Sequence, residues 1–198
     1  METAETPKVD DPRRAKLLEA ALSVFARFGF RKASMDDVAR AASLSRQGLY
    51  LHFATKEALF VATVEHALTT SLRAAESRLD DEASPLEKRL TGAFDEWVGR
   101  YVGMFGGDVA DVAEAADTLA GTVVPAFERR FVDAVAKMIR TSGLLSAYKR
   151  SGLSARQLAD TLNAAARGLN HSSQSRAEFT SQMAIAVRAL CAVRTNPA

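Results

Sequence analysis

The chain has 198 residues, of which 47% are hydrophobic and 25% are charged, and its formal net charge is +2. This balance is typical of a soluble globular protein and excludes a disordered chain. No apolar run approaches the roughly 20 residues that a helix needs to span a membrane, so we expect no transmembrane helix. The first residues, METAETPKVDDPRR, lack the apolar segment of a secretory signal, so we expect the protein in the cytoplasm.

The single cysteine, Cys191, excludes an intrachain disulfide framework and a thiolate metal cluster. We expect it to be a small buried hydrophobe, with a disulfide between two chains as the alternative. No cofactor and no metal are expected. Residues 8–60 hold ten Lys or Arg and six Asp or Glu, whereas residues 61–198 hold sixteen of each. The basic excess near the N-terminus mildly favours a polyanionic partner.

The chain shows almost no alternation of apolar and polar residues, and its apolar residues recur at helical spacing. The sequence therefore predicts an all-α fold. A first helix is expected to begin at Pro12, with Asp10 and Asp11 as capping residues, and to end at Gly29.

Two short helices and a tight turn come next. Ser34 opens the first of them, and residues 43–45 form the turn. Ser45 can cap the second, which carries Arg46 and Tyr50. Two short helices joined by a tight turn make a helix-turn-helix.

Longer helices are predicted for the rest of the chain. Thr55 caps a helix that runs to Leu79. The next helix begins with a capping box, Ser84-Pro85-Leu86-Glu87, and its apolar stripe extends to Phe105. Further helices are expected near 108–120, 124–138, 155–169 and 176–192, the last two with capping boxes at Ser154 and Ser175, while residues 141–153 are ambiguous.

One run of the sequence carries a family resemblance: LLEAALSVFARFGFRKASMDDVARAASLSRQGLYLHFATKEALF. It has an amphipathic helix ending in Phe-Gly-Phe, then Val-Ala-x-x-Ala before the turn, Leu-Tyr-x-His-Phe after it, and finally Lys-Glu-x-Leu. In these features residues 13–59 resemble the TetR (tetracycline-repressor-like) family of bacterial transcription regulators. Three positions depart from the family pattern. Ser43 stands where glycine is usual, Gln47 where a small residue is frequent, and Gly48 lies inside the recognition helix.

The resemblance implies an N-terminal three-helix domain whose third helix enters the major groove of DNA. Arg46 can pair with guanine and Gln47 with adenine, and Gly48 would let the backbone come close. Other positions match family residues that contact phosphates. The residues expected at DNA are Ser34, Ser45, Arg46, Gln47, Gly48, Tyr50, His52 and Lys56.

Several of these basic and aromatic residues have structural alternatives. Tyr50 can be a core residue with a solvated hydroxyl, and His52 a structural hydrogen-bond partner. Arg31 and Lys32 either touch phosphate or lie on a solvated face. The basic residues whose role stays open are Arg13, Arg14 and Lys16.

The resemblance further implies a DNA-binding domain over residues 1–55 and an effector-binding and dimerisation domain over residues 56–198. It implies a homodimer joined through the last two helices, and two-fold symmetry then predicts a palindromic operator. Both helices are rich in small residues, which permit close packing, although alanine is also simply a good helix former. The dimer contacts expected are Ala165, Gly168, Ala184 and Arg188.

A small-molecule pocket among the middle helices is also implied by the resemblance. Aromatic groups with a polar tip suit such a pocket, but the same stripes can fill a core. The scarcity of charge on them favours a largely apolar or aromatic effector. The ligand contacts expected are His66, Phe94, Trp97, Tyr101, Phe127, Phe131, Asn163 and Arg167.

Together these expectations describe a DNA-binding transcriptional regulator. A homodimeric repressor released by a ligand is the leading interpretation, because repression is the commoner outcome in the family. The alternative is a helical DNA-binding or partner-binding protein that senses no ligand. An enzyme is not expected, because the sequence lacks a phosphate-binding glycine loop, a Gly-x-Ser-x-Gly motif and histidines at metal-ligand spacing.

Overall fold

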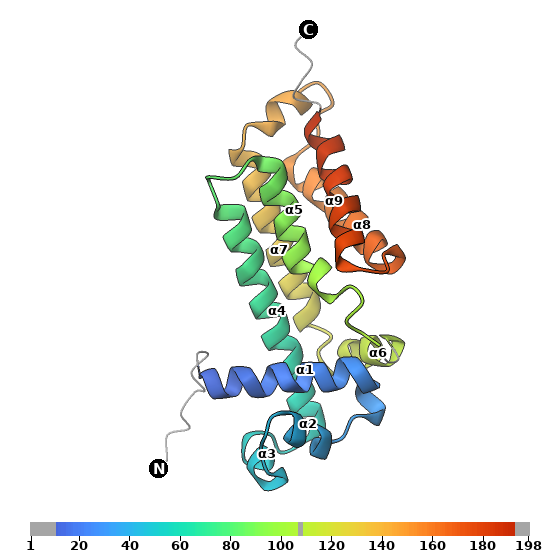
Figure 1. The fold of residues 1–198 in the computed structure, drawn as a ribbon. Helices are drawn as coiled ribbons and strands as arrows, with labels where there is room; N and C mark the ends of the chain where they lie inside the picture. Colours follow the sequence, from blue (N-terminus) through green and yellow to red (C-terminus); the bar gives the residue numbers. More distant parts are fainter. Residues whose placement is uncertain (1–10, 107–108, 193–198) are drawn as a thin grey trace. The chain divides into compact units, whose positions relative to one another are not determined.

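The computed structural model describes residues 11–106 and 109–192 and confirms the all-α fold (Figure 1). Within this part of the chain the residues form α-helices and two 3-10 helices, and none is in a strand. The elements are α1 (Pro12–Lys32), α2 (Met35–Ala41), α3 (Arg46–His52), α4 (Lys56–Asp80), α5 (Leu86–Trp97), η1 (Gly99–Tyr101), α6 (Val109–Leu119), α7 (Val123–Thr141), η2 (Leu144–Tyr148), α8 (Ala155–Ser172) and α9 (Arg176–Cys191).

The chain forms two compact units. Of the described residues, the N-terminal unit comprises 11–67, 106 and 109–120, and the C-terminal unit comprises 68–105 and 121–192. The division falls inside α4 and assigns α6 to the N-terminal unit. The boundary predicted at residue 55 lies just before α4, and no local feature of the sequence marks α6 as a partner of α1.

The core of the N-terminal unit is built around three phenylalanine rings. Phe25 and Phe60 meet edge to face with 5.1 Å between ring centroids, and Phe30 lies 4.9 Å from Phe60. Phe25 and Phe60 are almost fully buried, so this cluster joins α1 to α4. Buried aromatic pairs of this geometry are among the stronger contacts of a small core.

Helix α1 begins as predicted, because the Asp11 side chain accepts a hydrogen bond from the backbone N–H of Arg13 and Pro12 opens the first turn. Asp10, the other expected cap, lies outside the described residues. The helix is interrupted at Gly29, where φ is +78°, and a last short stretch continues to Lys32. The predicted end at Gly29 is therefore a kink followed by one more turn.

The kink at Gly29 fits against α6. The carboxylate of Asp111 accepts a hydrogen bond from the backbone N–H of Arg31 at 2.9 Å and forms an ion pair with the Arg31 side chain at 3.0 Å. A Cβ at position 29 would lie 2.5 Å from the same carboxylate. Glycine is required here both by the positive φ and by the close approach of Asp111.

In the C-terminal unit, α5 packs along α9 and α7 packs along α8 (Figure 1). Its core contains Phe94 and Phe131, which are fully buried with 5.0 Å between their centroids. Trp97 stacks on Phe131 at 4.9 Å and is only partly buried. Cys191 is buried, as predicted.

Two predictions about α5 are wrong. The helix ends at Trp97 and gives way to η1, whereas the apolar stripe had extended it to Phe105. A Cβ at Gly99 would lie 2.6 Å from the Asp95 carboxylate and 2.8 Å from the Phe179 ring, so glycine is required just after the helix ends. The capping box at Ser84 is also absent, because Pro85 is the N-cap and no side chain caps the helix.

The predicted starts of α8 and α9 are confirmed to different degrees. Ser154 and Gln157 form a complete capping box. Ser175 accepts a hydrogen bond from the N–H of Glu178, but the Glu178 carboxylate bonds the N–H of Gln174 instead of closing the box. Both helices nevertheless begin at the predicted residues.

Candidate nucleic-acid interface

The turn between α2 and α3 is a helix-ending motif with a residue in the left-handed conformation. The N–H of Leu44 donates to the carbonyl of Ala39 at 2.8 Å, and the N–H of Ser43 donates to the carbonyl of Arg40 at 3.2 Å. These two bonds define a Schellman motif, which places Ser43 at the position usually taken by glycine. Ser43 has φ +56°, the one non-glycine positive φ among the described residues.

Helix α3 starts immediately after this motif. The Ser45 hydroxyl caps it by accepting a hydrogen bond from the N–H of Gly48 at 3.0 Å. A Cβ at Gly48 would lie 3.1 Å from that hydroxyl, so a larger residue would crowd the cap. Leu49 is fully buried and fixes the inner face of α3 in the core, which leaves Gln47 and Tyr50 exposed.

The Arg46 side chain at the start of α3 is held by two neighbours. Its guanidinium donates to the carboxylate of Asp36 on α2 at 3.1 Å, and it lies 5.7 Å from the centre of the Tyr50 ring. Both partners are on the solvent side, so the contact orients Arg46 more than it stabilises the fold.

Ser34 and Lys56, both expected at phosphate, are engaged inside the unit. Ser34 caps α2 in a complete capping box with Asp37, and its hydrogen bonds lower the pKa of the Asp37 carboxyl. The Lys56 ammonium donates to the carbonyls of Phe30, Arg31 and Ala33 at 2.9, 3.3 and 3.1 Å. Three carbonyls match the three donors of an ammonium group, so Lys56 caps the C-terminal end of α1, and we do not propose it as a phosphate contact.

Basic residues of α1 are likewise tied to the unit. The Arg14 guanidinium lies 4.8 Å from the centre of the Phe53 ring, which connects the start of α1 to the residue that ends α3. Arg31 is paired with Asp111 and Glu114 of α6. His52 is exposed at the end of α3.

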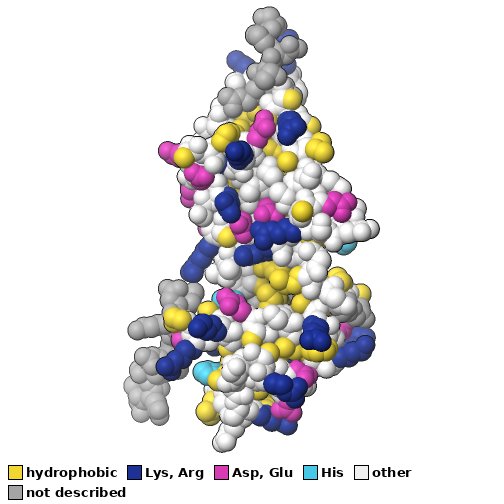
Figure 2. Space-filling view, in the orientation of Figure 1, with side chains coloured by type: hydrophobic (Ala, Val, Ile, Leu, Met, Phe, Trp, Pro, Cys, Tyr) yellow, Lys and Arg dark blue, Asp and Glu magenta, His cyan; other side chains and the backbone are white. Residues whose placement is uncertain are grey.

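The basic side chains do not gather into one patch on the face shown in Figure 2. Lys and Arg side chains are spread over both units, with Asp and Glu side chains among them. The charge imbalance of residues 8–60 therefore does not by itself locate an interface. The candidate interface is located by the exposed side chains of α3.

Seven of the eight predicted ligand residues belong to the C-terminal unit. Phe94 and Phe131 are fully buried against each other and fill the core. Trp97 and Phe127 are partly buried beside that core. The Tyr101 hydroxyl lies 2.6 Å from the Ser71 hydroxyl.

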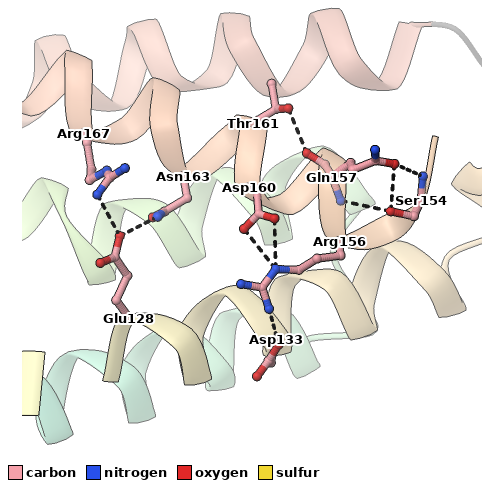
Figure 3. Close-up of polar contacts among 9 residues, drawn as sticks. All are labelled: Glu128, Asp133, Ser154, Arg156, Gln157, Asp160, Thr161, Asn163 and Arg167. Atoms are coloured by element: carbon pink, nitrogen blue, oxygen red, sulfur yellow. Dashed lines mark hydrogen bonds and ion pairs between the residues drawn. The ribbon is translucent and has the colours of Figure 1, made fainter. Parts of the chain in front are cut away.

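The polar members of this set meet at Glu128 (Figure 3). Its carboxylate accepts a hydrogen bond from the Asn163 amide at 2.7 Å and forms an ion pair with Arg167 at 3.4 Å. The Asn163 side-chain oxygen is buried and accepts no hydrogen bond within the described part of the chain. His66 lies apart from this set, in the N-terminal unit, where burial lowers the pKa of its imidazole.

The four predicted dimer residues lie on α8 and α9. Gly168 and Arg188 are exposed, and Ala165 and Ala184 are half-buried. Next to Ala184, Ile185 is 63% exposed, which the sequence analysis did not single out. None of the helices in residues 11–106 and 109–192 is long and apolar enough to cross a membrane, and no three His, Cys, Asp or Glu side chains there are grouped as a metal site requires.

The geometry of the N-terminal unit defines a helix-turn-helix, and comparison with known proteins shows which family this domain resembles. Residues 17–63 match the model of the bacterial regulatory proteins of the tetR family. This match assigns the N-terminal residues to the DNA-binding domain of TetR-family transcriptional regulators, and it covers about a quarter of the chain. The predicted resemblance is thereby confirmed.

Two relatives and one solved structure illustrate the similarity. The A-factor receptor protein of Streptomyces griseus is 32% identical over 38% of this chain and 25% of its own length. The transcriptional repressor KstR2 of Mycolicibacterium smegmatis is 34% identical over 46% of this chain and 43% of its own length, so the match spans less than half of either relative. The fatty acid degradation regulator FadR from Bacillus halodurans shares the fold, with a TM-score of 0.65 and 14% identity over 93% of this chain and 97% of that one.

Proposed function

We propose that this protein is a sequence-specific transcriptional regulator that binds a palindromic operator as a homodimer and represses transcription. The observation that carries the proposal is the geometry of α3. Leu49 anchors its inner face, Ser45 and the Schellman motif fix its start, and Arg46, Gln47 and Tyr50 lie on its exposed side. A short helix held in this way can enter the major groove, because packing supplies the stability that its length does not.

A dimer is proposed because one copy of α3 makes too few contacts with DNA for useful affinity. A single module makes few phosphate and base contacts, and a second copy doubles both. Exposed small residues and Ile185 on α8 and α9 offer a surface for a second chain. Repression is supported by the family resemblance and by the description of KstR2 as a repressor.

The proposed effector is a small, largely apolar or aromatic molecule bound in the C-terminal unit. Partly buried Trp97 and Phe127 supply aromatic surface, and the unpaired oxygen of Asn163 supplies a buried acceptor for a ligand donor. The relative described as a receptor supports ligand binding in this class of protein. A ligand that prefers the form with lower DNA affinity must weaken DNA binding by the same factor.

The test is selection of binding sites from random duplex DNA near physiological salt, with Arg46→Ala beside the wild type. We expect an enriched palindrome, and Arg46→Ala should bind it about 10- to 100-fold more weakly. Arg129→Ala is the matched control, because it removes an exposed arginine of α7 and should leave the affinity unchanged. Weak, salt-sensitive binding without an enriched sequence would overturn the proposal, whereas an enriched duplex becomes the probe for molecules that release it.

A further inference from the structure

Leu51 of α3 is the most exposed large hydrophobic side chain in the described residues. Its exposed fraction is 84%, compared with 41% for Tyr50 and 0% for Leu49 in the same helix. The N-terminal unit does not need a leucine at this position, because the core contact of α3 is made by Leu49. Leu51 therefore calls for an explanation outside the folded monomer.

Helix geometry places Leu51 on the face that we assign to DNA. At 100° per residue, Gln47 and Leu51 project on the side opposite the buried Leu49, with Tyr50 on one side of them and His52 on the other. The side chains beside Leu51 on this face are thus an amide, a phenol and an imidazole. An apolar protein partner would leave these polar groups unpaired, whereas base edges and phosphates satisfy them.

The major groove presents one apolar group to such a side chain, which is the 5-methyl of thymine. We propose that Leu51 is a specificity-determining residue that reads a thymine in each half-site through this methyl group. The inference rests on the proposed function, because it requires α3 to lie in the major groove. It adds an apolar contact to the polar contacts expected from Arg46 and Gln47.

Deletion of the methyl from the DNA tests the contact directly. In the enriched duplex, each thymine of the half-site is replaced in turn by deoxyuridine, which keeps every hydrogen-bonding group and removes only the methyl. At one position per half-site, wild-type protein should bind about fourfold more weakly, as expected for one buried methyl-sized group. Leu51→Ala should bind the thymine and deoxyuridine duplexes equally. The losses of affinity caused by removing the side chain and by removing the methyl should therefore not add.

Two further variants separate this contact from general effects of truncation. Leu51→Met keeps an apolar side chain of similar volume and should keep the preference for thymine. Leu153→Ala truncates another exposed leucine, in the segment before α8, and should respond to deoxyuridine as the wild type does. Because Leu51 is exposed, its replacement should leave the unfolding temperature unchanged, which a melting curve checks.

The outcomes distinguish this inference from the proposed function. Sensitivity at one thymine that Leu51→Ala abolishes supports the contact. Equal sensitivity in Leu51→Ala would assign the methyl to another side chain, such as Tyr50, and overturn the inference. An enriched duplex that tolerates deoxyuridine everywhere, or has no thymine in its half-sites, overturns it as well while leaving the regulator intact. Failure to enrich any sequence removes both.

Discussion

At Ser43 the turn of the helix-turn-helix adopts a backbone conformation that lowers the stability of the folded chain. It occupies the left-handed position of the Schellman motif with φ +56°, where a side chain is disfavoured and glycine is not. Both hydrogen bonds of the motif are nevertheless made. The strain is therefore confined to one residue, and the turn keeps the geometry that α3 needs.

We expect Ser43→Gly to stabilise the N-terminal unit. Relief of the left-handed strain should outweigh the larger backbone entropy of glycine in the unfolded chain, giving a gain of up to about 1 kcal/mol. Denaturant unfolding followed by circular dichroism measures it. Ser43→Val, with a branched side chain at the same φ, should lower the free energy of unfolding, and equal stability of all three proteins would contradict the argument.

At the scale of elements, α6 contacts the end of α1, shortly before the helix-turn-helix begins. Asp111 is 6% exposed, and its carboxylate holds both the backbone and the side chain of Arg31. Ser34, which opens α2, follows Arg31 closely in the chain. The position of α6 therefore influences where the helix-turn-helix begins.

Asp111→Ala should lower the free energy of unfolding by about 2 kcal/mol, because it leaves the partly buried N–H of Arg31 without its acceptor and removes one of the two carboxylates paired with the guanidinium. Glu114→Ala is the matched control. Glu114 is on the same helix and pairs with the same arginine, but its side chain is 65% exposed. Its loss should change stability by less than about 0.5 kcal/mol, as for other surface ion pairs. Similar effects of the two substitutions would show that burial of Asp111 does not matter.

The same elements show how far the sequence could be interpreted. The starts of α1, α2, α3, α8 and α9 were predictable, because each is set by a capping residue within a few positions of the helix. The end of α5 and the role of Lys56 were not. Gly99, just after the end of α5, lies against Phe179 of a distant helix, and Lys56 bonds carbonyls more than 20 residues away. Neither contact leaves a local signal in the sequence.

The predicted sites divide in the same way. The exposed face of α3 follows from Leu49 being apolar within a short helix, so the exposure of Arg46, Gln47 and Tyr50 was accessible from the sequence, while their contact with DNA stays a prediction. Leu51 was not singled out, because it stands at the unspecified position of Leu-Tyr-x-His-Phe. In the C-terminal unit the sequence could not tell Phe94 and Phe131, which fill the core, from Trp97, which is only partly buried.

At the scale of the whole molecule, the proposed function depends on association of two chains. Ile185 is a large apolar side chain that is 63% exposed on α9, beside the predicted dimer residue Ala184. A chain of 21.3 kDa should therefore sediment with twice that mass. A buried aspartate in such an interface lacks a partner, so Ile185→Asp should shift the protein toward the monomer.

Operator affinity should fall with the dimer. If each half-site is bound by one protomer, Ile185→Asp should bind the full palindrome with the low affinity and weak salt response of a single module, since half of the phosphate contacts are lost. Analytical ultracentrifugation and binding at several salt concentrations measure the two effects. Leu153→Asp places the same charge at another exposed leucine and should leave both unchanged. A monomeric wild type, or a dimer that Ile185→Asp leaves intact, would remove α9 from the interface and require another explanation for a palindromic site.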